Sequence, residues 1–161
     1  MTEPSDHAAD LERASEDIIA FAESCSPEEW VTVVPGDNWP VCVVVHHVAE
    51  GYDLVSGWID CALTDRPVEH TASGIDAANS RHADDFAGVG VQETVDLLRV
   101  KGSAVVAKIR GLNVSDLALT AAFGPAGGQP FKVEQFCVVA AGHVRSHLGR
   151  AATALGRDAP P

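Results

Sequence analysis

The sequence has little of what marks secreted, membrane-bound or nucleic-acid-binding proteins. Its 161 residues contain 11 Lys and Arg against 23 Asp and Glu, which gives a formal net charge of −12. Phosphate binding needs a basic surface, so we expect no nucleic-acid partner. The N-terminus lacks the basic and apolar regions of an export signal. The longest apolar run, around residues 41–45, is far too short to span a bilayer. We therefore expect a cytoplasmic protein with no membrane partner.

The chain has four cysteines, and their spacing excludes one kind of metal site. The four cysteines are Cys25, Cys42, Cys61 and Cys137, and none forms a C-x-x-C pair. A zinc site built from cysteines is therefore not expected. In a reducing cytosol these residues are best interpreted as small buried apolar side chains.

Helical periodicity dominates the rest of the chain, and alternating hairpin signals are absent. With 46% apolar and 21% charged residues, the chain is expected to fold as one domain over residues 1–161. Apolar residues recur at helical spacing, and a capping box marks a short turn at 26–30. The predicted long helices cover residues 5–25, 40–63, 74–111, split or kinked near 88–90, and 132–155. Four such helices predict an all-α four-helix bundle.

The segment before the last helix, residues 113–130, is rich in glycine and proline. A loop of this length in a compact domain is often functional. It leads directly into the last helix, so we expect it to be able to cover a site there.

Two histidines on that last helix suggest a metal site. His143 and His147 are four residues apart, which places them on one helical face. That face is also the apolar one, where unsatisfied imidazole nitrogens are costly. A metal ion satisfies them well, but two ligands do not complete a site. The second helix offers His46 and His47, about 100° apart around the axis. We choose His47 as the inward residue, with His46 as the competing choice.

These residues also resemble a known family. The segment Trp39-Pro40-Val41, followed by His47-Val48-Ala49-Glu50-Gly51 and by His143-x-x-x-His147 near the end, resembles the DinB/YfiT-like superfamily. It looks closest to the actinobacterial branch around mycothiol-dependent maleylpyruvate isomerase. The resemblance implies a four-helix bundle in which a triad of histidines, here His47, His143 and His147, holds a divalent metal. It also implies thiol S-transferase or isomerase chemistry with a thiol such as mycothiol or bacillithiol.

Three neutral imidazoles would leave one position on the ion open, where a bound thiol would ionise more easily. Zn²⁺ is the default ion, with Ni²⁺, Fe²⁺, Co²⁺ and Mn²⁺ open. The expected partners are a small-molecule thiol and an electrophile, and exposed helix faces would permit a homodimer.

Three further residues have both a functional and a structural interpretation. Glu50 is either a general base or metal-site partner, or a solvated acid. Gly51 either leaves room for a ligand or permits helix packing. Arg150 either holds an anionic group of the thiol or makes a surface ion pair.

The remaining histidines, His7, His70 and His82, are expected at the surface.

Two alternatives to an enzyme stay open. One is a non-catalytic, metal-binding or stress-related bundle, and the other is a bundle whose histidines only form hydrogen bonds.

Overall fold

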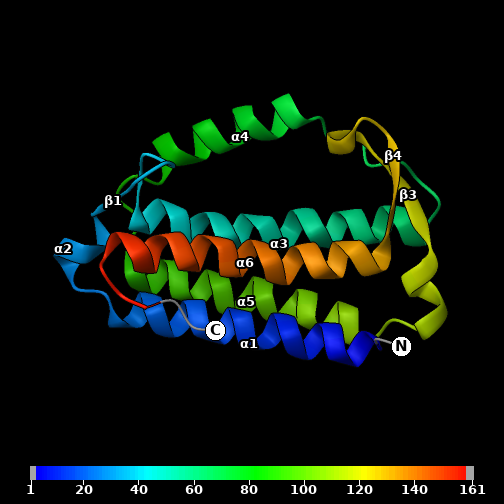
Figure 1. The fold of residues 1–161 in the computed structure, drawn as a ribbon, viewed down its shortest axis with the longest axis horizontal. Coiled ribbons are helices and arrows are strands. Elements are labelled where there is room, and N and C mark those ends of the chain that lie inside the picture. Colours follow the sequence, from blue (N-terminus) through cyan, green and yellow to red (C-terminus); the bar gives the residue numbers. More distant parts are fainter. Residues whose placement is uncertain (1–2, 159–161) are drawn as a thin grey trace.

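Four long helices form a bundle in the computed structural model, which describes residues 3–158 (Figure 1). They are α1 (Pro4–Ser24), α3 (Val41–Leu63), α5 (Val91–Arg110) and α6 (Val133–Ala154). Around the bundle, α1 packs on α5, α5 on α3, α3 on α6 and α6 on α1. The predicted helical bundle is confirmed. None of the described helices is both long and apolar enough to cross a membrane.

Helix α3 is the most deeply buried helix. Residues 41–49 are all buried, although valine, which makes up most of this run, favours strands by propensity. The helix forms because neighbours cover it on every side: α5, α6, α4 and the short strands before it. A helix apolar all round is typical of such a central position.

The predicted third helix is split more completely than a kink would require. Its first part is a separate helix, α4 (Ala72–Asp85), and the chain breaks before α5 begins at Val91. Figure 1 shows α4 set apart from the bundle, on the outer side of α3. Only the second part, α5, therefore belongs to the four-helix core.

Short strands are present where none was expected. Strand β1 (Val33–Val34) pairs with β2 (Trp39–Pro40), and β3 (Thr120–Phe123) pairs with β4 (Gln129–Lys132). Three short helical turns, α2 (Pro27–Trp30), η1 (Val114–Ala118) and η2 (Gly124–Ala126), complete the fold. The strands are two to four residues long, too short for an alternating pattern to show in the sequence.

The β3–β4 hairpin does not cover the histidines, contrary to the expectation for residues 113–130. Its Phe123 packs on Trp58 and Phe136, with ring centroids 4.9 and 5.4 Å away. Trp58 lies eleven residues after His47, about 16 Å along α3. The hairpin thus closes an apolar end of the bundle.

The cysteines are free, as expected, but they are not equally buried. Cys42 and Cys137 are buried, whereas Cys25 and Cys61 are half-buried.

Candidate metal centre

The structure brings His47, His143 and His147 together between α3 and α6. One ring nitrogen from each residue lies within 4.8 Å of the other two. The Nε2 atoms of His47 and His143 are 3.3 Å apart. The ring centroids are 4.4 to 5.1 Å from one another. His47 and His147 are buried, and His143 is partly buried.

A glycine on α3 makes this convergence sterically possible. A Cβ atom on Gly51 would lie 2.6 Å from Cε1 and 2.8 Å from Nδ1 of His143. No side chain fits there without moving the ring. The space beside Gly51 is therefore taken by the imidazole of His143, and the glycine serves the site by letting that ring approach α3.

The environment keeps the three imidazoles neutral. Burial is the largest cause, and it lowers the pKa of His47 to about 3, of His143 to about 4 and of His147 to about 2. The positive charge of Arg150 lowers all three pKa values further. At neutral pH each ring thus carries one proton and one unprotonated nitrogen, and the unprotonated nitrogen is the atom that can bind a metal ion.

One of the three nitrogen–nitrogen separations matches the spacing around a tetrahedral ion. Two nitrogen–metal bonds of 2.0–2.1 Å at a tetrahedral angle put the nitrogens about 3.4 Å apart. The observed separation of 3.3 Å between His47 and His143 agrees with this. Three imidazoles are also the donor set of many catalytic zinc sites, which keep a fourth position for water or substrate. The three residues could hold a divalent metal.

The guanidinium of Arg150 contacts two side chains although the residue is exposed. Its Nη1 pairs with Oδ1 of Asp37, and its Nη2 lies 2.9 Å from Nδ1 of His147. Asp37 sits in the β1–β2 turn, and its carboxylate is only 14% exposed. The arginine therefore makes an ion pair, one of the two roles expected for it, and it also contacts a residue of the triad.

A second histidine pair lies beside the triad, and sequence reasoning missed it. Nδ1 of His46 is 3.2 Å from Nε2 of His82, and Phe86 stacks on His46 at 4.1 Å between centroids. Both histidines are buried, so the expectation that His82 lies at the surface was wrong. The pattern of α3 alone did not reveal that α4 covers the face carrying His46. His46 is the neighbour of the triad, and its ring lies outside the group of three.

The other two histidines differ from each other. His7 is buried near the start of α1, which corrects the expected surface position, and His70 is exposed.

A cavity of about 340 Å³ opens beside the triad, between α3 and α4. Its wall includes His47, Glu50, His70 and His82. His47 thus belongs both to the triad and to a space large enough for a small ligand.

Glu50 lies on this cavity wall with 44% of its side chain exposed. Nζ of Lys101 is 2.8 Å from Oε1 of Glu50 and 2.6 Å from Oδ2 of Asp53. Burial alone would raise the pKa of Glu50, but the hydrogen bond and charge of Lys101 bring it below its usual value. The carboxylate is consequently ionised and already paired.

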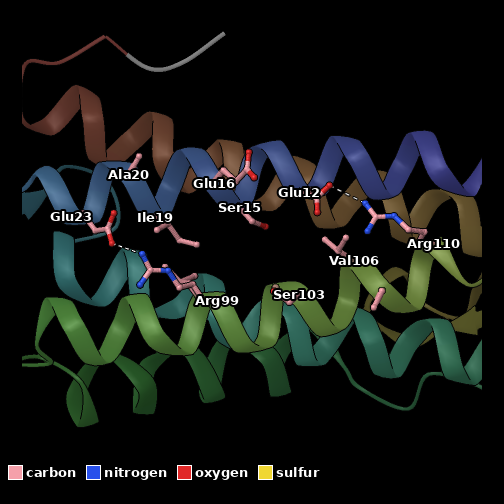
Figure 2. A pocket seen from close by; sticks show the side chains of 13 residues that line it. Glu12, Ser15, Glu16, Ile19, Ala20, Glu23, Arg99, Ser103, Val106 and Arg110 are labelled. Atoms are coloured by element: carbon pink, nitrogen blue, oxygen red, sulfur yellow. Dashed lines mark hydrogen bonds and ion pairs between the residues drawn. The ribbon is translucent and has the colours of Figure 1, made fainter.

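A separate groove of about 460 Å³ runs between α1 and α5. Figure 2 shows two ion pairs across it, Arg99 with Glu23 and Arg110 with Glu12. Among the described residues that line it, none belongs to the histidine cluster.

Comparison with known proteins supports the fold. The sequence model of the DinB superfamily matches residues 10–151. The solved structure titled "Sibling Lethal Factor Precursor - DfsB" superposes with a TM-score of 0.73, covering 97% of this chain and 96% of that one, at 15% identity. At that identity the likeness shows the fold alone. A comparison with curated protein sequences gives no match.

Proposed function

Because the chain belongs to the DinB superfamily, which includes metal-binding enzymes, we propose that it is a divalent-metal-dependent enzyme acting on a small thiol. The proposed ligands are His47, His143 and His147. The reaction is the transfer of a mycothiol-type thiol to an electrophile, or a related isomerisation or detoxification. The observation that carries this proposal is the convergence of three neutral imidazoles, all within 4.8 Å, next to an open cavity.

The proposed reaction needs a bound cation and a binding position for the thiol beside it. A divalent ion, when bound, would lower the pKa of a thiol at its open position, so that the thiolate forms near neutral pH. Zn²⁺ is our first choice, and Ni²⁺, Fe²⁺, Co²⁺ and Mn²⁺ also suit imidazole ligands.

The protein's own groups would then position the reactants. His47 forms the boundary between the triad and the cavity, so a thiol bound at the triad would face that cavity. Glu50 is the ionised carboxylate on the same wall, and its free oxygen can accept a proton from an incoming thiol. Helix α4 forms the opposite wall of the cavity through Ala78, Asn79 and His82.

A second candidate function is a metal-binding protein without catalysis. Glu50 is paired with Lys101, and Arg150 with Asp37 and His147. Both charged groups are already paired within the protein, which favours this alternative. The two candidates share the metal site and differ in turnover.

Metal content tests the site first. Protein purified without a His-tag and reconstituted with Zn²⁺ should hold about one equivalent of zinc, whereas His147→Ala should hold less than about a tenth. His70→Ala is the matched control, because it removes an exposed imidazole from the same cavity and should keep its zinc. Equal zinc in wild type and His147→Ala would show that the ligands are wrongly assigned.

Turnover separates the two candidates. Zinc-loaded protein incubated with mycothiol and a panel of electrophiles should form a thiol-dependent product, and His147→Ala should not. A zinc-loaded wild type that forms no product with any electrophile supports the non-catalytic alternative.

A further inference from the structure

Arg150 lies between the largely buried carboxylate of Asp37 and the histidine triad. It lies one turn after His147 on α6. Its Nη2 is 2.9 Å from Nδ1 and 3.4 Å from Nε2 of His147. Its Nη1 pairs with Oδ1 of Asp37, and its Nε donates to the carbonyl of Ser146 at 3.4 Å. The guanidinium is therefore fixed against the ring by contacts on both sides.

The contact with His147 uses the one lone pair that this ring has. A guanidinium has only donors and stays protonated in proteins. A neutral imidazole has one N–H and one nitrogen with a free lone pair. When Nη2 of Arg150 donates to Nδ1, that nitrogen must be the acceptor and the proton must lie on Nε2.

A metal ion needs the same lone pair. If the ion binds Nδ1, it takes the place of the arginine donor directly. If it binds Nε2, the proton moves to Nδ1, where it faces the N–H of Arg150, and the hydrogen bond is lost. Either way, His147 cannot bind Arg150 and a metal ion at the same time. Electrostatic repulsion between the positive ion and the positive guanidinium also opposes their binding to His147 together.

We propose that Arg150 is a competitor of the metal ion at His147, displaced when the ion binds and restraining its uptake. The inference rests on the proposed function, because it takes His147 as a ligand. It assigns to Arg150 a role distinct from that of a substrate anchor.

Asp37 can also bind the guanidinium of Arg150 after it has left His147. Oδ2 of Asp37 is buried and has no hydrogen-bond partner among the described residues, which is costly for a carboxylate oxygen. A guanidinium released from His147 can pair with both oxygens of Asp37 in the bidentate geometry that arginine favours. The structure thus supplies a partner for Arg150 in the metal-bound state as well.

Zinc affinity measures the competition. Wild type and Arg150→Met would be titrated with Zn²⁺ alone against a chelator at pH 7.5. Arg150→Met should bind zinc at least about tenfold more tightly, because no hydrogen bond has to be broken and no like charge is near. The matched control is Arg145→Met, which removes the same charge from the same helix but a different ion pair, with Asp10. It should stay within about twofold of wild type, because the Arg145 guanidinium pairs with Asp10 on α1 and not with a ring of the triad.

Nitrogen-15 spectra of the wild-type protein give a readout that needs no variant. In the zinc-free protein, Nδ1 of His147 should be unprotonated, and the Arg150 side-chain signal should move on adding Zn²⁺. An Arg150 signal that zinc leaves unchanged would overturn the inference. So would equal zinc affinity in wild type and Arg150→Met, although the metal site would then stand. Zinc binding in none of the proteins would overturn the proposed function, and the inference with it.

Discussion

Gly51 shows how much of the site depends on a missing side chain. The His143 ring lies so close to α3 that a Cβ on Gly51 would approach it to 2.6 Å. The neighbouring atoms belong to a rigid imidazole ring, which cannot bend away at one end. The same helix contains Gly57, where a Cβ would have no neighbour within 4 Å. One helix thus offers a glycine that the site requires and one that it does not.

Gly51→Ala should therefore impair the proposed metal site while leaving the bundle folded. We expect zinc affinity to fall at least about tenfold, because the displaced His143 can no longer meet the other two ligands. Chelator competition measures the loss. Gly57→Ala is the control: it should keep the affinity of wild type and raise the free energy of unfolding by about 0.5–1 kcal/mol, since alanine replaces glycine inside a helix. Unchanged zinc affinity in Gly51→Ala would contradict the assigned role of the glycine.

At the scale of elements, α4 is the loosely attached part of the fold. Among its residues, all of which the structure describes, only His82 is buried. Its attachment includes the contact of His82 with His46 and the stacking of Phe86, just after the helix, on His46, and the partly buried Ile75 and Ala83 also pack against the core. A helix with so few buried contacts opens at low free-energy cost. Because α4 forms one wall of the cavity at His47, its opening would control access to the triad.

His82→Ala should loosen this helix selectively. Amide hydrogen exchange in residues 72–85 should become at least about tenfold faster, because the buried anchor is lost, while exchange in α3 and α6 stays slow. Ser80→Ala changes an exposed residue of the same helix and should leave exchange nearly unchanged. Equal acceleration in α6 would show instead that His82 stabilises the whole bundle.

The placement of α4 also explains where sequence reasoning reached its limit. The four bundle helices and the facing of His143 and His147 follow from local spacing, which a sequence displays directly. His47 approaches His143 and His147 because α3 packs against α6 in the bundle. The burial of His46 and His82 depends on the path that residues 64–71 take from α3 back to its outer face, and no periodicity encodes that path. The pairing of Arg150 with Asp37 likewise joins residues 113 positions apart.

At the scale of the whole molecule, the few basic residues link helices to one another. Arg145 pairs with Asp10, Arg110 with Glu12, Lys108 with Asp60 and Lys101 with Glu50. These pairs tie α1 to α5 and α6, and α5 to α3. Most are half-exposed, where an ion pair contributes little stability. The buried histidines affect stability more strongly, because their protonation would place charge inside the bundle.

Metal-free protein should therefore lose stability in mildly acidic solution. The three triad imidazoles have pKa values of about 2 to 4 in the folded protein, against about 6.5 in the unfolded chain. Below pH 6.5 the unfolded chain binds more protons than the folded one, so the folded state is penalised. The stabilising contribution is complete above pH 6.5 and is lost as the pH falls toward the folded pKa values.

Urea unfolding of metal-free protein at pH 7.5, 6.5 and 5.5 measures this effect. Between pH 6.5 and 5.5 each such histidine should cost about 1 kcal/mol, hence about 3 kcal/mol for the triad and about 1 kcal/mol more for His46, whose pKa burial lowers to about 4. This window lies above the range in which the ion-paired carboxylates titrate, so the loss belongs to histidine. His143→Gln should lose about 1 kcal/mol less over the same interval, because one titrating ring is absent. A free energy of unfolding that stays constant from pH 7.5 to 5.5 would mean that burial does not hold the triad neutral. The imidazoles would then lack the unprotonated nitrogens that the proposed metal ion needs.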